Sequence, residues 1–302
     1  MLNLEDLYTI HEQNKDSIKA KVEEFSIGNK QFNFNTEKAI LGVINLSNDS
    51  WYRESVCLSA ETAIRRGMVL KSQGADVVDI GAESTLEKAE RVEDIRQKSQ
   101  ILPVLKALNQ EGVLTSIETY YPEVATECLK AGANIINLTG PEKSAEIYQT
   151  VSEFNAGVII CYVQGKNVRE VGDFDFGDDP TNLMYEYFAQ EIETATKYGV
   201  RKIFIDPGLG FYYKNLQDSS LRIGYQMKTF LNTFRLRKLG FPVCHALPHA
   251  FECFGEEVRS AEPFFCVLAA LGKTDLFRTH EVPKIRAVLD TLELFQKQGS
   301  RE

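Results

Sequence analysis

Seven polar residues stand at the ends of short apolar segments, where one fold could gather their side chains into a single site. They are Asn45, Asp79, Glu118, Asn137, Asp206, Arg278 and His280. Carboxylates accept hydrogen bonds and amides both donate and accept them, so Glu118, Asn137 and Asp206 suit a heteroaromatic ring with mixed edges. Arg278 suits stacking on such a ring or clamping a phosphate, and His280 and Asn45 suit contacts to the same anion.

Polar residues after strands have an alternative use, since Asn, Asp, Ser and Thr commonly cap the next helix or form the intervening turn. Asp49, Ser84, Thr85 and Thr119 fit that use best. Asn45, Glu118, Asn137 and Asp206 fit it less well, because each lies at or inside the end of an apolar segment and needs a polar partner there. Together the strand-end residues predict a ligand site.

Eight apolar, β-branched segments alternate with eight longer amphipathic ones, which is the pattern of repeated β-α units. The predicted strands are 39–46, 75–81, 113–118, 133–138, 157–163, 201–206, 241–247 and 274–280. The predicted helices are 60–73, 88–110, 121–131, 141–154, 181–199, 217–239, 255–272 and 282–297. Eight such units favour an α/β fold of the (β/α)8 TIM-barrel type, and the main rival is an open doubly wound sheet.

The organisation predicted from this pattern is one large domain with an N-terminal extension. Residues 1–38 are expected to form a helix and a short hairpin that cap the barrel floor, and residues 39–302 to form the barrel. Active sites of such barrels lie where the strands end, so the strand-end residues are expected to meet at one face.

Composition excludes several classes of protein. A net charge of −9 without a basic cluster argues against nucleic-acid binding. The chain has neither a signal-peptide pattern nor an apolar stretch near the ~18 residues that span a bilayer, so no membrane association and a cytoplasmic location are expected. The cysteines show no metal-binding spacing and are expected to be reduced core residues: Cys57, Cys128, Cys161, Cys244, Cys253 and Cys266.

Five motifs in order carry a resemblance to the dihydropteroate synthase family, a group of pterin-binding TIM barrels. They are GVINLSNDSWY (42–52), GADVVDIGAEST (74–85), TSIETYYPEVATECLKAGANIINLTG (115–140), FIDPGLGF (204–211) and FRTHEV (277–282). The resemblance covers about residues 27–297. It implies transfer of a dihydropterin methyl group from its diphosphate to an arylamine such as 4-aminobenzoate, with Mg²⁺ accompanying the diphosphate and a homodimeric assembly.

The resemblance also assigns roles to residues of this chain. It places catalytic roles at Arg278, Asp206 and His280, and pterin contacts at Asn137, Asp206 and Arg278. It implies diphosphate contacts at Asn45 and His280, with Asn45 as the Mg²⁺ ligand, and places Thr85 beside the diphosphate and second substrate. Asp79, Glu118 and His249 complete the expected substrate-binding set.

The chain departs from the family's pattern on the second-substrate side. After the seventh strand the family has a lysine that holds the pterin carbonyl, whereas this chain reads HALPHAFECFG (245–255), with Ala250 or Phe251 at that place. Other departures are Glu118 for Asp, Leu86 for Arg, and Cys161-Tyr162-Val163 for a Met-His-Met-like segment. Loss of one charged contact costs a few kcal/mol unless another group replaces it.

His249 is the nearest candidate replacement for that lysine, and its alternative is an exposed turn residue after Pro248. A metal site formed by His245, His249 and His280 is a weaker alternative, because Pro248 forbids a regular helical pair. Two other functions remain open: a pterin-binding paralogue without synthase activity, and a methyl-tetrahydrofolate-binding barrel of the methyltransferase type. The DPGLGF and FRTH segments favour the synthase branch.

Overall fold

The computed structural model of this chain describes all residues except 51, 85–88, 90, 212 and 300–302. Its centre is a sheet of eight parallel strands in the order β8-β7-β6-β5-β4-β3-β10-β9. The strands are β3 (Ala39–Asn45), β4 (Val77–Gly81), β5 (Thr115–Thr119), β6 (Ile135–Leu138), β7 (Gly157–Cys161), β8 (Lys202–Asp206), β9 (Cys244–Ala246) and β10 (Leu276–Thr279).

The two ends of the sheet meet beside β8. Ile205 N donates to Pro242 O at 3.1 Å, and a parallel bridge joins Ile205 to Val243, just before β9. The sheet is therefore closed, as in a (β/α)8 barrel. The predicted TIM barrel is confirmed, and the alternative of an open doubly wound sheet is wrong.

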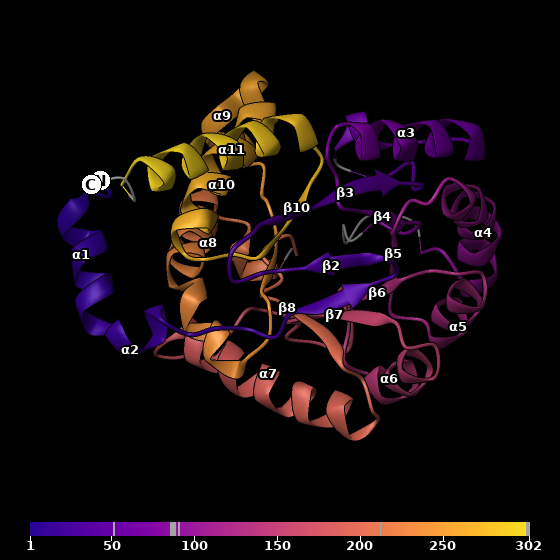
Figure 1. Ribbon diagram of the computed structural model, residues 1–302, viewed down its shortest axis with the longest axis horizontal. Coiled ribbons are helices and arrows are strands. Elements are labelled where there is room, and N and C mark those ends of the chain that lie inside the picture. The colour runs from indigo at the N-terminus through magenta and orange to yellow at the C-terminus, as the bar shows by residue number, and fades with distance from the viewer. Residues whose placement is uncertain (51, 85–88, 90, 212, 300–302) are drawn as a thin grey trace.

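Helices follow the strands and surround them as a ring (Figure 1). They are α3 (Ala60–Ser72), α4 (Asp94–Gln110), α5 (Pro122–Lys130), α6 (Ser144–Glu153), α7 (Pro180–Lys197), α8 (Ser219–Asn232), α10 (Ala261–Leu271) and α11 (Val282–Gly299). Short 3-10 segments break the pattern at η1 (Arg53–Ser55), η2 (Lys214–Leu216), η3 (Thr233–Leu239) and η4 (Gly255–Ser260).

Two of the helices predicted as continuous are divided. The segment 217–239 becomes α8 and then η3, and the segment 255–272 becomes η4 and then α10. In the second case Pro263 lies in the first turn of α10, the position where a missing N–H disturbs no helical hydrogen bond. In this second case the segment η4 lies between the loop after β9 and α10.

The N-terminal segment contains α1 (Leu4–Gln13), α2 (Lys15–Ile18) and an antiparallel hairpin of β1 (Phe25–Ile27) and β2 (Lys30–Phe32). Phe25 and Phe34 pack edge-on against Phe204 of β8, with ring centroids 5.2 and 5.4 Å apart. The predicted helix and hairpin are thus confirmed, and the domain boundary at residues 38 and 39 stays a prediction.

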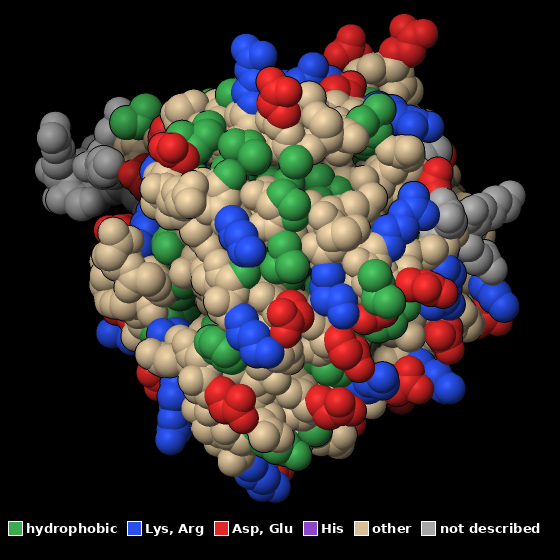
Figure 2. Space-filling model, turned by 90° about the vertical axis from the view of Figure 1, so that its right-hand side faces the viewer, with side chains coloured by type: hydrophobic (Ala, Val, Ile, Leu, Met, Phe, Trp, Pro, Cys, Tyr) green, Lys and Arg blue, Asp and Glu red, His purple; other side chains and the backbone are tan. Residues whose placement is uncertain are grey.

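Five of the six cysteines are buried, and all six are free. Cys253 is exposed, so the expectation of a core cysteine is wrong there, because it lies in the one-turn helix α9 (Phe251–Phe254), which has no buried residue. No helix among the described residues is long and apolar enough to cross a membrane. On the face shown in Figure 2, acidic and basic side chains are interspersed.

Candidate functional site

The interior of the barrel has two layers, because alternate residues of a strand point to the same side. An apolar lower layer includes Val77, Ile135, Ile159, Phe204 and Leu276. Two residues further along the same strands lie Asp79, Asn137, Cys161, Asp206 and Arg278. With Glu118 of β5 they form what we call the polar layer, at the end of the barrel where the strands finish.

Arg278 connects the acids of the polar layer. Its Nε lies 2.8 Å from Asp79 Oδ2, and its terminal nitrogen forms an ion pair with Glu118. Asn137 Nδ2 donates to the same Asp79 oxygen at 3.1 Å, and Asn137 Oδ1 accepts from the Cys161 thiol at 3.3 Å. Five of the strand-end side chains predicted from the sequence therefore lie together in one cluster with Cys161: Asp79, Glu118, Asn137, Asp206 and Arg278.

The polar layer carries more acids than Arg278 can neutralise. Burial raises the pKa of Glu118 to about 7, and Arg278 opposes that rise. Burial likewise raises the pKa of Asp206 to about 6, against a hydrogen bond from Gly208 N. Burial alone would lower the pKa of Arg278, but Glu118 and Asp79 hold it above its ordinary value. The layer is therefore suited to a ligand that presents several N–H donors.

A cavity of about 540 Å³ opens above the polar layer, within the usual size range of small-molecule sites. Glu118 and Arg278 form part of its wall, together with Asn45, His249 and His280. Asp79, Asn137 and Asp206 do not line it, since they are at most 3% exposed and lie deeper in the barrel interior. The guanidinium of Arg278 thus separates the cavity from part of the predicted site.

Asn45 lies at the end of β3 on the cavity wall. Its Nδ2 donates to Ser50 Oγ at 2.8 Å and to Ser55 Oγ at 2.7 Å. No hydrogen bond from a described residue reaches its Oδ1, and an amide oxygen is a suitable ligand for a hard cation such as Mg²⁺. The amide oxygen of Asn45 is thus left for a further partner at the cavity wall.

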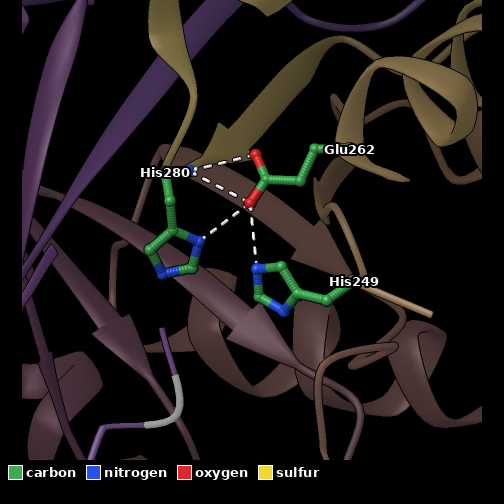
Figure 3. Close-up of side chains that lie close together, drawn as sticks. All are labelled: His249, Glu262 and His280. Carbon is green, nitrogen blue, oxygen red and sulfur yellow. Dashed lines mark hydrogen bonds and ion pairs between the residues drawn. The ribbon is translucent and has the colours of Figure 1, made fainter. Parts of the chain in front are cut away.

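A second group, which we call the histidine wall, consists of His249, Glu262 and His280 (Figure 3). The ring of Tyr52 stacks on both of its imidazoles. Glu262 Oε1 lies 3.2 Å from His249 Nε2 and 2.9 Å from His280 Nδ1. Its Oε2 accepts from the Thr279 hydroxyl and from His280 N. Burial would raise the pKa of Glu262, but the hydrogen bonds from both imidazoles hold it well below its usual range.

Several expectations about the loop after β9 need correction. His249 is no exposed turn residue, because its side chain is 13% exposed and pairs with Glu262. His245 does not join the other two histidines: it is fully buried, its Nε2 lies 2.7 Å from Thr233 Oγ1, and burial lowers its pKa to about 3. The proposed histidine trio is therefore wrong, and Glu262 stands in place of His245. Thr85 and Leu86 lie outside the described residues.

Sequence reasoning missed three residues of the site. Glu262 begins an otherwise apolar helix, AEPFFCVLAAL, and a lone acid in such a segment is a usable signal. Arg222 of α8 lines the cavity with a side chain 14% exposed and pairs with Glu252, and Tyr52 covers both imidazoles. We find no sequence signal for these last two.

Comparisons with known proteins agree with the fold and show the family of this chain. Residues 41–247 match the family model described as pterin binding enzyme. The chain is 28% identical to a dihydropteroate synthase of Synechocystis over 269 residues, 85% of this chain and 89% of the relative. Its fold resembles that of the Burkholderia cenocepacia dihydropteroate synthase solved with 7,8-dihydropteroate (TM-score 0.78, 21% identity, 93% of this chain and 99% of the other). The Xanthomonas albilineans enzyme solved with 4-aminobenzoic acid is similarly close (TM-score 0.76, 23% identity, 91% and 99%).

Proposed function

This chain belongs to the pterin-binding enzyme family, and from that premise we propose that it is a dihydropteroate synthase-like transferase. It would bind a dihydropterin methyl diphosphate at the barrel mouth and transfer the pterin-methyl group to an arylamine. The names of its relatives favour this activity over a methyl-tetrahydrofolate-binding barrel of the methyltransferase type. The residues with which it recognises the arylamine would differ from those that the family motifs imply.

One observation carries the proposal: the polar layer holds a buried acceptor without a donor. Asp79 Oδ1 is inaccessible to solvent, and no described residue donates to it. Buried polar atoms are nearly always hydrogen-bonded, so an unpaired carboxylate oxygen at a barrel mouth is best explained by a ligand N–H. The amino and ring N–H groups of a pterin supply such donors to Asp79 and its neighbours.

Arg278 has to move for a pterin to contact Asn137 and Asp206. Its guanidinium is paired with Asp79 and Glu118, between the cavity and the deeper residues. We propose that the pterin replaces Arg278 as the partner of these acids, and that the guanidinium then covers the ring face. A guanidinium plane stacks well on aromatic rings. Because it is itself positively charged, it stabilises a second positive charge poorly, so we place it against the diphosphate as well as against the ring.

The proposed reaction breaks the bond between the pterin methylene carbon and the diphosphate oxygen and forms a bond from that carbon to the amine nitrogen. Diphosphate leaves, and the amine releases one proton. Mg²⁺ held by Asn45 Oδ1 would neutralise charge on the leaving diphosphate. The chain's own contribution is to orient the two reactants and to hold the ring, with electrostatics rather than covalent catalysis.

We propose that the family lysine is replaced on the second-substrate side. Ala250 and Phe251 line the cavity there and offer no side-chain donor. Arg222 is a cation that lines the same cavity. We propose that Arg222, released from Glu252, binds the carboxylate of the arylamine, which would shift the preference of the site away from that of a lysine-containing synthase.

The test is product formation from purified protein with dihydropterin methyl diphosphate, Mg²⁺ and 4-aminobenzoate. We expect dihydropteroate and an equal amount of pyrophosphate, and a loss of more than about 100-fold in rate for Asp206→Asn. Ala250→Lys and Phe251→Lys restore the missing cation and are expected to raise the rate with 4-aminobenzoate. No product from the wild type or from either lysine variant would refute the synthase proposal.

The absence of the lysine also favours a second candidate, a pterin-binding protein that does not perform the synthase reaction. Calorimetry with the dihydropterin and its diphosphate separates the two: binding without turnover supports the second candidate, and absence of binding contradicts both. The homodimer and the cytoplasmic location stay predictions.

A further inference from the structure

The histidine wall brings three metal-ligand side chains to one point. His249 comes from the loop after β9, Glu262 from the first turn of α10 and His280 from the end of β10. One nitrogen of each imidazole faces the same carboxylate, and the ligand atoms all lie within 4.8 Å of one another (Figure 3). Three separate elements thus bring their ligand atoms close enough for one metal ion to draw them together.

The donor set is that of a transition metal. Two imidazole nitrogens and one carboxylate oxygen are a common set of protein ligands for Zn²⁺, which leaves a fourth position for another ligand. Metal-ligand bonds of about 2.0–2.1 Å place tetrahedral ligand atoms roughly 3.3 Å apart. The distances of 3.2 Å from His249 and 2.9 Å from His280 to Glu262 Oε1 are close to that spacing. All three ligand atoms lie within 4.8 Å of one another, so the metal would draw the two imidazole nitrogens toward each other.

The electrostatics of the cluster favour a bound cation. Glu262 is fully buried, and no Lys or Arg among the described residues lies within ion-pair distance of it. By contrast, the buried carboxylate of Asp275 is paired with Arg237 and Lys38. The hydrogen bonds that Glu262 accepts stabilise its carboxylate but bring no Lys or Arg charge to it, and a divalent cation at Oε1 would supply that charge.

Neighbouring groups hold the donors in place. The Thr279 hydroxyl and His280 N occupy Glu262 Oε2, so that Oε1 alone faces the imidazoles. The ring of Tyr52 stacks on His249 at 4.7 Å and on His280 at 4.5 Å, which fixes both imidazole planes. Such outer partners are the usual support of metal ligands and adjust their affinity.

We propose that His249, Glu262 and His280 bind a divalent transition metal of the Zn²⁺ class, distinct from Mg²⁺ at Asn45. Both histidines line the cavity, so the open coordination position faces it. The metal would present a fixed positive charge on the side where the family lysine is replaced. A phosphate oxygen of the substrate would be its fourth ligand, and this last step alone rests on the proposed function.

The experiment measures Zn²⁺ binding to the metal-stripped full chain by calorimetry, with the visible spectrum of the Co²⁺ form as a second readout. We expect one ion per chain and the strong absorption bands of four-coordinate Co²⁺. Glu262→Gln and His249→Ala are each expected to weaken binding by more than about 100-fold, and Thr279→Val by about 10-fold, as for an outer partner. His11→Ala is the matched control, because His11 lies exposed on α1.

His249→Ala covers the case in which Glu262→Gln fails to fold, since His249 is only partly buried. No stoichiometric Zn²⁺ binding by the wild type, or equal binding by His249→Ala and His11→Ala, overturns the proposal and leaves the cluster as a hydrogen-bonded network. Pyrophosphate titrated with and without Zn²⁺ tests the fourth ligand. Zn²⁺ binding without synthase activity contradicts the proposed function only, and activity without Zn²⁺ binding contradicts this inference only.

Discussion

The polar layer and the histidine wall face the same cavity, but different physical causes place their residues. The polar layer lies on strands, where residues two apart share a face and neighbouring strands fix the register, as in the pairing of Glu118 with Asn137. In the histidine wall, His249 lies in the loop after β9, a strand of three residues, and that loop has Ala250 at φ 46°. Its shape depends on the docking of α10, not on sheet register. The strands of the barrel thus supply one half of the site, and a locally irregular segment contributes to the other.

The largest expected effect tests whether Arg278 is essential to the polar layer. Arg278→Met leaves Asp79 and Glu118 buried without their cation, and breaking a buried ion pair in this way costs about 3–5 kcal/mol. The measurement is the free energy of unfolding in urea. Adding Glu118→Gln to this variant should recover part of the loss. A loss below about 1 kcal/mol would mean that solvent compensates these acids, contrary to their burial.

The second prediction concerns the pH dependence of stability. Because the pKa of Glu118 is raised to about 7 in the folded chain, from an ordinary value of 4.5, its proton stabilises the fold at low pH. This contribution is complete below pH 4.5 and is lost as the pH rises through about 7, by at most about 3 kcal/mol.

The measured quantity is the difference in unfolding free energy between the wild type and Glu118→Gln, because other groups titrate in both proteins. We expect this difference to shift against the wild type between pH 5 and 8. Asp206 has a raised pKa of about 6 and produces a trend of the same sign in both proteins, so the difference reports Glu118 together with its interaction with Asp206. A difference that is constant over this range contradicts the assignment to Glu118.

The same contrast explains what the sequence could and could not predict. Asp79, Asn137 and Asp206 follow from strand alternation, because an apolar segment that ends in a polar residue places it at the barrel mouth. The partner of His280 does not follow, since Glu262 lies 18 residues away on another element. Likewise, the pairing of Arg278 with Glu118 joins residues 160 positions apart and depends on rotamers that no periodicity encodes.

A third, smaller effect tests whether stacking organises the histidine wall. Tyr52→Leu removes the ring that lies against both imidazoles, whereas Tyr52→Phe keeps the ring and removes only the hydroxyl bonded to Glu281. We expect the leucine variant to be less stable than the phenylalanine variant by about 1–2 kcal/mol in urea unfolding, from two aromatic contacts. Equal stability of the two variants would show that the hydroxyl, not the ring, supports the wall.

The smallest expected effect concerns backbone strain, which differs between the loop that carries His249 and the polar layer. Ala250 adopts φ 46° and ψ 51°, a left-handed conformation that costs an L-residue about 1–2 kcal/mol, and no residue of the polar layer has a positive φ. Ala250→Gly relieves that strain but adds freedom to the unfolded chain and removes a buried methyl group, so we expect a net gain of about 0.5 kcal/mol. Asn155→Gly is the matched control, because Asn155 has φ 49° and asparagine tolerates this region, so little change is expected. If Ala250→Gly instead destabilises the chain, packing of the methyl group in the cavity wall contributes more stability than the left-handed backbone costs. Packing would then hold the irregular loop as firmly as it holds the strands.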